Sequence, residues 1–229
     1  MAEALPWPCP LPSGDTASEW AITDGPPPAP ARLLIIPALF DEANKLRRFT
    51  REVMRRLAGA GITTILPDLP GCHESLQPLA AQTPSLWRTA MASAAAHFAA
   101  THVLAIRGGA LLAPPLPGWH YAPLAGASQL RQMLRARILS AREAGREETQ
   151  DSLLAQGQQS GLTLAGYTLS PAFLREFGGL VPDPETVSTL PQTLLAAPGL
   201  WLRAEPGEDP AQADALAAIL AIALREEAP

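Results

Sequence analysis

Cysteine is nearly absent from this sequence of 229 residues, which contains only Cys9 and Cys72. Two cysteines are too few for a disulfide framework, and they lack the CxxC spacing of many metal sites. We therefore expect no metal centre, no bound cofactor and a reducing, cytoplasmic location.

An excess of positive charge is also missing. The chain has 17 Lys and Arg against 22 Asp and Glu, a formal net charge of −5, so nothing predicts binding to nucleic acid or to an anionic membrane surface. No apolar run approaches the roughly 18 residues that a membrane span needs, and no basic segment precedes an apolar one near the N-terminus. We expect a protein that is not exported and has no transmembrane segment.

Predicted strands and helices alternate along the chain. Its apolar content of 47% is enough to form the core of one domain over residues 1–229. Short apolar runs predict strands at 32–37, 63–66, 102–106, 119–123 and 200–203. Apolar residues at helical spacing predict helices at 44–59, 85–101, 128–145 and 210–225. This order predicts an α/β fold, a mostly parallel sheet flanked by helices, with functional residues at the carboxyl ends of the strands.

Residues of about 146–180 interrupt the alternation and predict a small cap. It contains a strand at 162–165 and a helix that begins at Ser170 and Pro171. Proline clusters predict loops at 26–30, 114–117 and 182–191.

Three loops follow the first three predicted strands: 37–44, 68–71 and the turn Arg107-Gly108-Gly109. This arrangement resembles α/β-hydrolases, in which a Gly-x-Ser-x-Gly turn raises a serine nucleophile above the sheet and backbone N–H groups form an oxyanion hole. Here Arg107 stands at the position of that serine.

The resemblance narrows to the exosortase A system-associated hydrolases of the second type. The segments that carry it, in matching order, are PALFDEANKLRR (37–48), LPDLPGCHES (66–75), LAIRGGALLA (104–113), LRQMLRARILSA (130–141) and LAGYTLSP (164–171). The resemblance implies an α/β-hydrolase-like fold, an arginine at the turn as a family trait, and partners in a bacterial exopolysaccharide and protein-sorting system. The chain departs from the family near its C-terminus, where no counterpart of a Pro-Phe-Trp segment is found.

Arg107 excludes serine catalysis at this turn, because a guanidinium stays protonated and offers only donors. Two interpretations stay open. Arg107, with Gly108 beside it, binds a carboxylate, phosphate or sugar acid of a ligand, or it neutralises a neighbouring acid such as Asp68.

The four histidines are His73, His97, His102 and His120. Hydrolases of this fold carry the catalytic histidine near the C-terminus, so the standard triad lacks its base as well as its serine. We interpret His97 and His102 as structural, and Cys72 and Ser75 as loop residues. Asp68, His73 and Glu42 remain weak candidates for activating a water molecule.

Where the first loop enters its helix, Phe40 and Asn44 are candidates for ligand contact, and Glu42 also suits the helix N-terminus. Arg137 falls inside the apolar face of helix 128–145. It snorkels, pairs with a buried carboxylate, or lines an anion site with Arg107. The acidic residues of 205–209 predict a solvated turn.

These residues support two hypotheses. The first is a protein that binds a small molecule, such as an acidic saccharide, near Arg107. The second is a catalytically inactive scaffold or binding protein of the same exopolysaccharide system.

Overall fold

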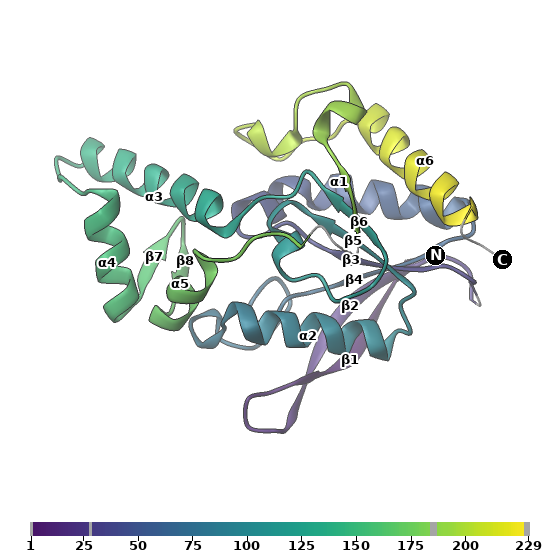
Figure 1. The fold of residues 1–229 in the computed structure, drawn as a ribbon, viewed down its shortest axis with the longest axis horizontal. Coiled ribbons are helices and arrows are strands. Elements are labelled where there is room, and N and C mark those ends of the chain that lie inside the picture. The colour runs from purple at the N-terminus through teal and green to yellow at the C-terminus, as the bar shows by residue number, and fades with distance from the viewer. Residues whose placement is uncertain (1, 28, 184–186, 227–229) are drawn as a thin grey trace.

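A seven-stranded sheet in the order β1-β2-β4-β3-β5-β6-β9 forms the centre of the computed structural model (Figure 1), which describes residues 2–27, 29–183 and 187–226. The strands are β1 Glu3–Pro10, β2 Thr16–Asp24, β3 Arg32–Ile36, β4 Thr63–Pro67, β5 His102–Ile106, β6 Gly118–Tyr121 and β9 Val187–Leu190. The last five pair in parallel, and β1 and β2 are antiparallel. The predicted mostly parallel sheet is confirmed.

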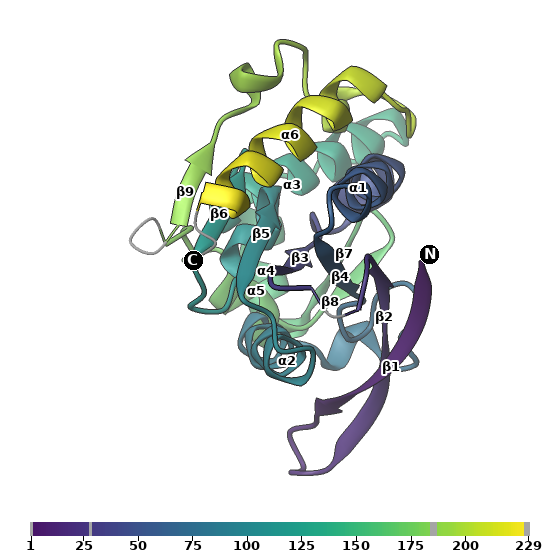
Figure 2. The same ribbon diagram turned by 90° about the vertical axis from the view of Figure 1, so that its right-hand side faces the viewer.

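Helices cover both faces of this sheet, as Figure 2 shows. They are α1 Asp41–Gly59, α2 Pro84–His97, α3 Gly126–Glu143, α4 Gln150–Ser160, α5 Pro171–Phe177 and α6 Pro210–Glu226, with the 3₁₀ helices η1 Leu79–Ala81, η2 Arg107–Leu111, η3 Gln192–Leu195 and η4 Leu200–Leu202. Helices α1 and α6 pack together on one face, and α2 lies on the other.

The central strands are apolar on both sides because both sides are covered. On β3, Leu33 and Ile35 belong to the core beneath α1 and α6, whereas Leu34 and Ile36 belong to the core beneath α2. All four side chains are fully buried. This is the burial that an uninterrupted aliphatic run predicts for a central parallel strand.

The cap, residues 150–177, lies beside α3 at the left of Figure 1. It consists of α4, the hairpin of β7 (Leu162–Leu164) and β8 (Tyr167–Leu169), and α5. The strand predicted at 162–165 and the helix predicted after Ser170 are both present. Ser170 caps α5 by accepting a hydrogen bond from the Phe173 N–H at 3.0 Å.

The prediction of a strand at 200–203 is wrong. Those residues form η4, because the Leu202 N–H bonds back to the Gly199 carbonyl and tightens the chain into a turn. The final strand is instead β9, inside the tract 182–191 predicted as a loop; residues 184–186 of that tract lie outside the described residues. Its polar sequence Val-Ser-Thr-Leu gives no strong strand signal.

Two local predictions also change. Thr83, not Ser85, caps α2, because its hydroxyl accepts from the Leu86 N–H at 3.2 Å and Pro84 is the first helical residue. Helix α2 ends at His97, four residues before the predicted end. The β1–β2 hairpin was not predicted.

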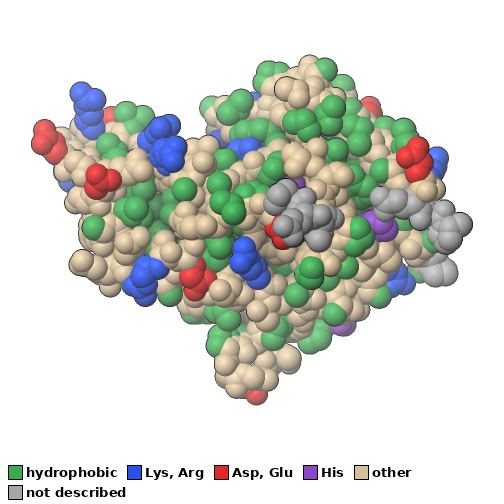
Figure 3. Space-filling model, viewed as in Figure 1, with side chains coloured by type: hydrophobic (Ala, Val, Ile, Leu, Met, Phe, Trp, Pro, Cys, Tyr) green, Lys and Arg blue, Asp and Glu red, His purple; other side chains and the backbone are tan. Residues whose placement is uncertain are grey.

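Within the described ranges, no helix is both long and apolar enough to span a membrane. On the face drawn in Figure 3, basic and acidic side chains are interspersed and gather into no large field of one sign.

Candidate functional site

The carboxyl ends of β3 and β5 meet at the centre of the sheet. Strand β4 pairs with one edge of β3 and β5 pairs with the other edge. The strands that follow β3 in sequence therefore lie on both sides of it. In open α/β sheets such a switch point is where ligands bind. The loop after β3 and the turn at Arg107 therefore occupy the expected place for a site.

The turn after β5 is strained and tightly packed. Arg107 has φ 54°, in the left-handed region that non-glycine residues rarely adopt. Gly109 is required because a Cβ there would lie 2.4 Å from the Pro37 carbonyl oxygen. The turn thus presents the Arg107 side chain at the carboxyl end of β5, in a backbone conformation that costs free energy.

Arg107 is held by an acid of the same chain. Its Nε and Nη2 donate to the Oε2 and Oε1 atoms of Glu42, both at 3.0 Å, and Nη1 donates to the Ala122 carbonyl at 2.9 Å. Three of its five N–H donors are thereby engaged. The acid is Glu42 and not Asp68, the partner that the sequence suggested.

Trp201 covers the same guanidinium, with its ring centroid 4.1 Å from the Arg107 Cζ atom. Arg107 is only 7% exposed and Glu42 only 8%. Sequence reasoning missed Trp201 because it assigned 200–203 to a strand. The pair therefore lies between α1 and η4, out of contact with most of the solvent.

Gln129, on α3, fills the space next to the turn. A Cβ on Gly108 would lie 2.1 Å from the Gln129 Oε1 atom, and Gln129 Nε2 donates to the Leu39 carbonyl at 3.1 Å. Gln129 is 3% exposed. In α/β-hydrolases, which the sequence resembles, the N–H groups of the turn after this strand and of the first loop bind the substrate oxygen. Here a protein amide lies beside both segments.

Asp68 and His73 lie together, next to Arg47. The Arg47 Nη1 atom is 3.7 Å from Asp68 Oδ1. Burial raises the pKa of Asp68 against the opposing charge of Arg47, and burial followed by Arg47 lowers the pKa of His73. The cavity that both residues line measures about 10 Å³, which is room for about one water molecule.

Phe40 and Asn44 contact the cap. Phe40 is 5% exposed and packs its ring against four aromatic rings, with centroid distances of 5.2 to 6.1 Å. Its partners are Trp87, Tyr167, Phe173 and Phe177. The Asn44 amide reaches the Tyr167 hydroxyl at 3.5 Å. Phe40, just before α1, and Asn44, in the first turn of α1, therefore both contact the cap.

Arg137 pairs with a carboxylate, but that carboxylate belongs to Glu148, whose side chain is 18% exposed and not buried as one interpretation proposed. Its Nε and Nη2 each donate to Glu148 at 2.9 Å, and Nη1 donates to the Thr163 carbonyl at 3.1 Å. No contact joins it to Arg107 within the described residues.

Cys72 and Ser75 have structural roles, as interpreted. Burial, followed by the charge of Asp68, raises the pKa of the Cys72 thiol to about 12, which leaves it unreactive. The Ser75 hydroxyl donates to Glu19 Oε1 at 2.9 Å and accepts from the Gly71 N–H. Glu19, 1% exposed on β2, was missed because a lone acid in an unpredicted hairpin carries no signal.

The remaining candidates also serve the fold. His102 stacks on Trp119 with ring centroids 6.0 Å apart. In the acidic turn before α6, Asp209 accepts from the Gln212 N–H at 3.1 Å. Neither region supplies a base to Arg107 or its neighbours within the part of the chain that the structure describes.

Comparisons with known proteins identify the fold. No protein-family model and no curated protein sequence matches the chain. Among solved structures, it resembles a protein of Agrobacterium vitis S4 described as a hydrolase, at 14% identity with a TM-score of 0.58, covering 99% of this chain and 98% of that one. It also resembles Est1E from Butyrivibrio proteoclasticus with bound ferulic acid, at 14% identity, TM-score 0.58 and coverage of 92% and 95%. The chain thus has the α/β-hydrolase fold.

Proposed function

We propose that this chain is a catalytically inactive binding or scaffold protein with an α/β-hydrolase fold, working in a bacterial exosortase and exopolysaccharide system. The observation that carries the proposal is the buried pair of Arg107 and Glu42 at the elbow. An active hydrolase keeps this position free for a nucleophile, whereas here it joins the turn to α1.

Two further observations support the loss of catalysis. Gln129 lies beside Gly108, where a substrate oxygen would have to enter. The cavity at Asp68 and His73, of about 10 Å³, has no room for a substrate next to an activated water.

An anionic ligand at Arg107 remains the second candidate, because two of its N–H donors have no hydrogen bond within the described residues. Such a ligand would have to share a buried guanidinium with Glu42 and displace Trp201. The pairing with Glu42 therefore favours the scaffold over the anion site.

The enzymatic part is tested with an ester panel on wild type, Arg107→Ala and Arg107→Ser. We expect no turnover above the uncatalysed rate in any of them, and no labelling by a serine-directed phosphonate, because restoring a serine does not restore a base. Turnover that the phosphonate abolishes would refute the proposal. A thermal-shift screen with sugar acids and phosphates tests the anion site: a shift lost in Arg107→Ala would establish it in place of the scaffold.

The link to exopolysaccharide rests on the sequence resemblance and needs a cellular test. In the bacterium that encodes this chain, deletion should reduce exopolysaccharide output, and Arg107→Lys with an intact fold should restore it as well as wild type does. Unchanged output and unchanged protein sorting after deletion would remove the assignment to this system.

A further inference from the structure

The connection from β5 to β6 lacks the helix that normally joins neighbouring parallel strands. It spans residues 107–117, and its only helical turn is η2, after which Pro114, Pro115 and Pro117 prevent a helix from continuing. Such connections usually place a helix over one face of the sheet. Here the face of β6 on the side of α2 is left without that cover.

A hollow of about 480 Å³ lies at this place, and we call it the β6 cavity. The lining residues that bear on its ligand are Arg88, Ala110, Leu111, His120, Asp183 and Val187. The volume falls within the range of small-molecule sites, and a mainly aliphatic wall with few polar groups is typical of them. No candidate residue of the elbow lines it.

His120 forms the polar floor of the β6 cavity. It alternates along β6 with Trp119 and Tyr121, which belong to the opposite core, so its ring points to the side of α2. It is 2% exposed, and its Nε2 atom has no hydrogen-bond partner in the described chain. A buried polar atom without a partner is rare in native proteins and indicates that a ligand group or water belongs there.

Arg88 supplies a cation at the rim. Its Nε donates to the Leu111 carbonyl at 2.7 Å, which fixes the guanidinium over η2. No hydrogen bond or ion pair within the described ranges engages its Nη1 or Nη2. These two nitrogens are available for a carboxylate.

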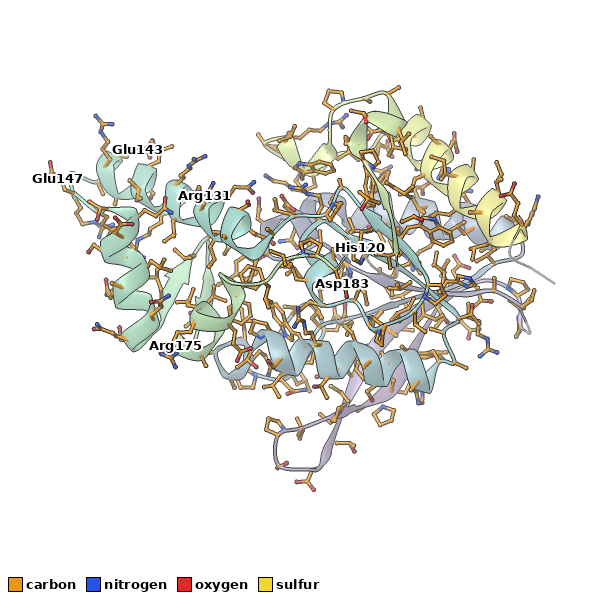
Figure 4. All side chains as sticks on the ribbon, in the orientation of Figure 1. His120, Arg131, Glu143, Glu147, Arg175 and Asp183 are labelled. Carbon is orange, nitrogen blue, oxygen red and sulfur yellow. The ribbon has the colours of Figure 1, made fainter. Side chains whose placement is uncertain are left out.

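Asp183 limits the charge of the ligand. It lines the cavity, and its carboxylate favours protonation of His120 although burial lowers the His120 pKa overall. Figure 4 labels both residues, which lie near each other. An acid so close to the binding groups disfavours a dianion such as a phosphate ester, whereas a single carboxylate can be balanced by Arg88.

We propose that the β6 cavity binds a small aliphatic monocarboxylic acid that carries a hydroxyl group. The carboxylate binds Arg88 at the rim, the aliphatic body lies against Ala110, Leu111 and Val187, and the hydroxyl bonds to His120 Nε2. This site is independent of the proposed loss of catalysis, because it shares no residue with the elbow.

Calorimetric titration with three matched probes tests the proposal. The probes are trans-4-hydroxycyclohexanecarboxylate, its carboxamide, and cyclohexanecarboxylate. Of the three probes, the hydroxy acid should bind wild type with the highest affinity. Arg88→Gln should weaken the hydroxy acid by about tenfold and leave the carboxamide unchanged, because a charge-assisted pair contributes about that much.

His120→Gln should reduce the preference for the hydroxy acid over cyclohexanecarboxylate. Because His120 is buried, circular dichroism must first establish that this variant is folded; Arg88 is exposed, so Arg88→Gln tests the proposal even if His120→Gln unfolds. Arg131→Gln, at an exposed arginine of α3 labelled in Figure 4, is the matched control and should bind like wild type.

Two results would overturn the inference. One is the absence of binding heat for the hydroxy acid at any soluble concentration. The other is an equal loss of affinity in Arg88→Gln and Arg131→Gln, which would reduce the effect to net charge.

Discussion

Arg107 and Glu42 face each other edge to edge, with Nε opposite Oε2 and Nη2 opposite Oε1, each pair 3.0 Å apart. This two-point pairing joins the turn after β5 to the first turn of α1. The pair therefore holds two segments of the chain together, and its contribution can be measured as a change in stability.

Glu42→Gln should lower the free energy of unfolding by about 3–5 kcal/mol, because it leaves the Arg107 charge buried without a counter-ion. Urea denaturation measures the change. Asp41→Asn is the control, since Asp41 pairs with Lys45 at the surface and should lose at most about 1 kcal/mol. A loss in Glu42→Gln no larger than in the control would contradict the structural role.

The double variant Glu42→Leu with Arg107→Met should recover much of the stability that either single change loses. Two apolar residues of similar volume avoid the free-energy cost of removing two charges from water. A double-mutant cycle in urea gives the coupling between the two positions. Additive losses would show that the two side chains do not depend on each other.

Gly109→Ala should destabilise the fold by about 1–3 kcal/mol, because the new methyl group meets the backbone oxygens of Pro37 and Ile36 and neither can move freely. Thermal and urea unfolding report the effect. Gly59→Ala, at the end of α1, meets no atom within 4 Å and should be neutral or stabilising. Similar behaviour of the two variants would argue against the tight turn.

Both thiols should resist Ellman's reagent at pH 8 in the folded protein. Burial is the main reason that the pKa of Cys9 is raised to about 11 and that of Cys72 to about 12. In urea, where the pKa returns to its ordinary value, both should react rapidly. Rapid reaction of either thiol in native buffer would contradict its burial in the folded protein.

Stability should fall as the pH drops below 6.5, the ordinary pKa of histidine. Burial lowers the pKa of His73 and of His120, so the unfolded chain binds more protons than the folded one between the lowered values and 6.5. Stability therefore rises with pH through this window. His73→Asn, which keeps a residue tolerant of the positive φ at this position, should show a weaker dependence than wild type in urea titrations from pH 7 to about pH 5.

Much of the fold was predictable because the central strands are buried on both faces and leave a strong apolar signal. The strands beginning at Arg32 and His102 and the helix ending at Gly59 appear close to their predicted positions. The β1–β2 hairpin was not predictable in the same way, since Pro6, Pro8 and Pro10 interrupt its pattern. Strand β9 was not predicted either, because Ser188 and Thr189 are both exposed at the edge of the sheet and interrupt the apolar pattern.

The site was predictable only in outline. Sequence order predicted a turn at Arg107, because a glycine pair follows a buried strand, and Arg107 does follow β5 directly. It did not identify Glu42 as the partner, since local sequence cannot rank two acids from different loops by their distance in space. Gln129 and Trp201 reach the elbow from α3 and η4 through the tertiary fold, and nothing near either residue in the sequence marks this role.

The position of strand β1 at the edge of the sheet bears on whether copies of the molecule aggregate. It pairs on one side only, so its other side is an open edge at which another chain could add a strand. Pro6, Pro8 and Pro10 occupy alternate positions along it and have no N–H to donate. The prolines that hid this strand from sequence analysis therefore also protect it from templating aggregation.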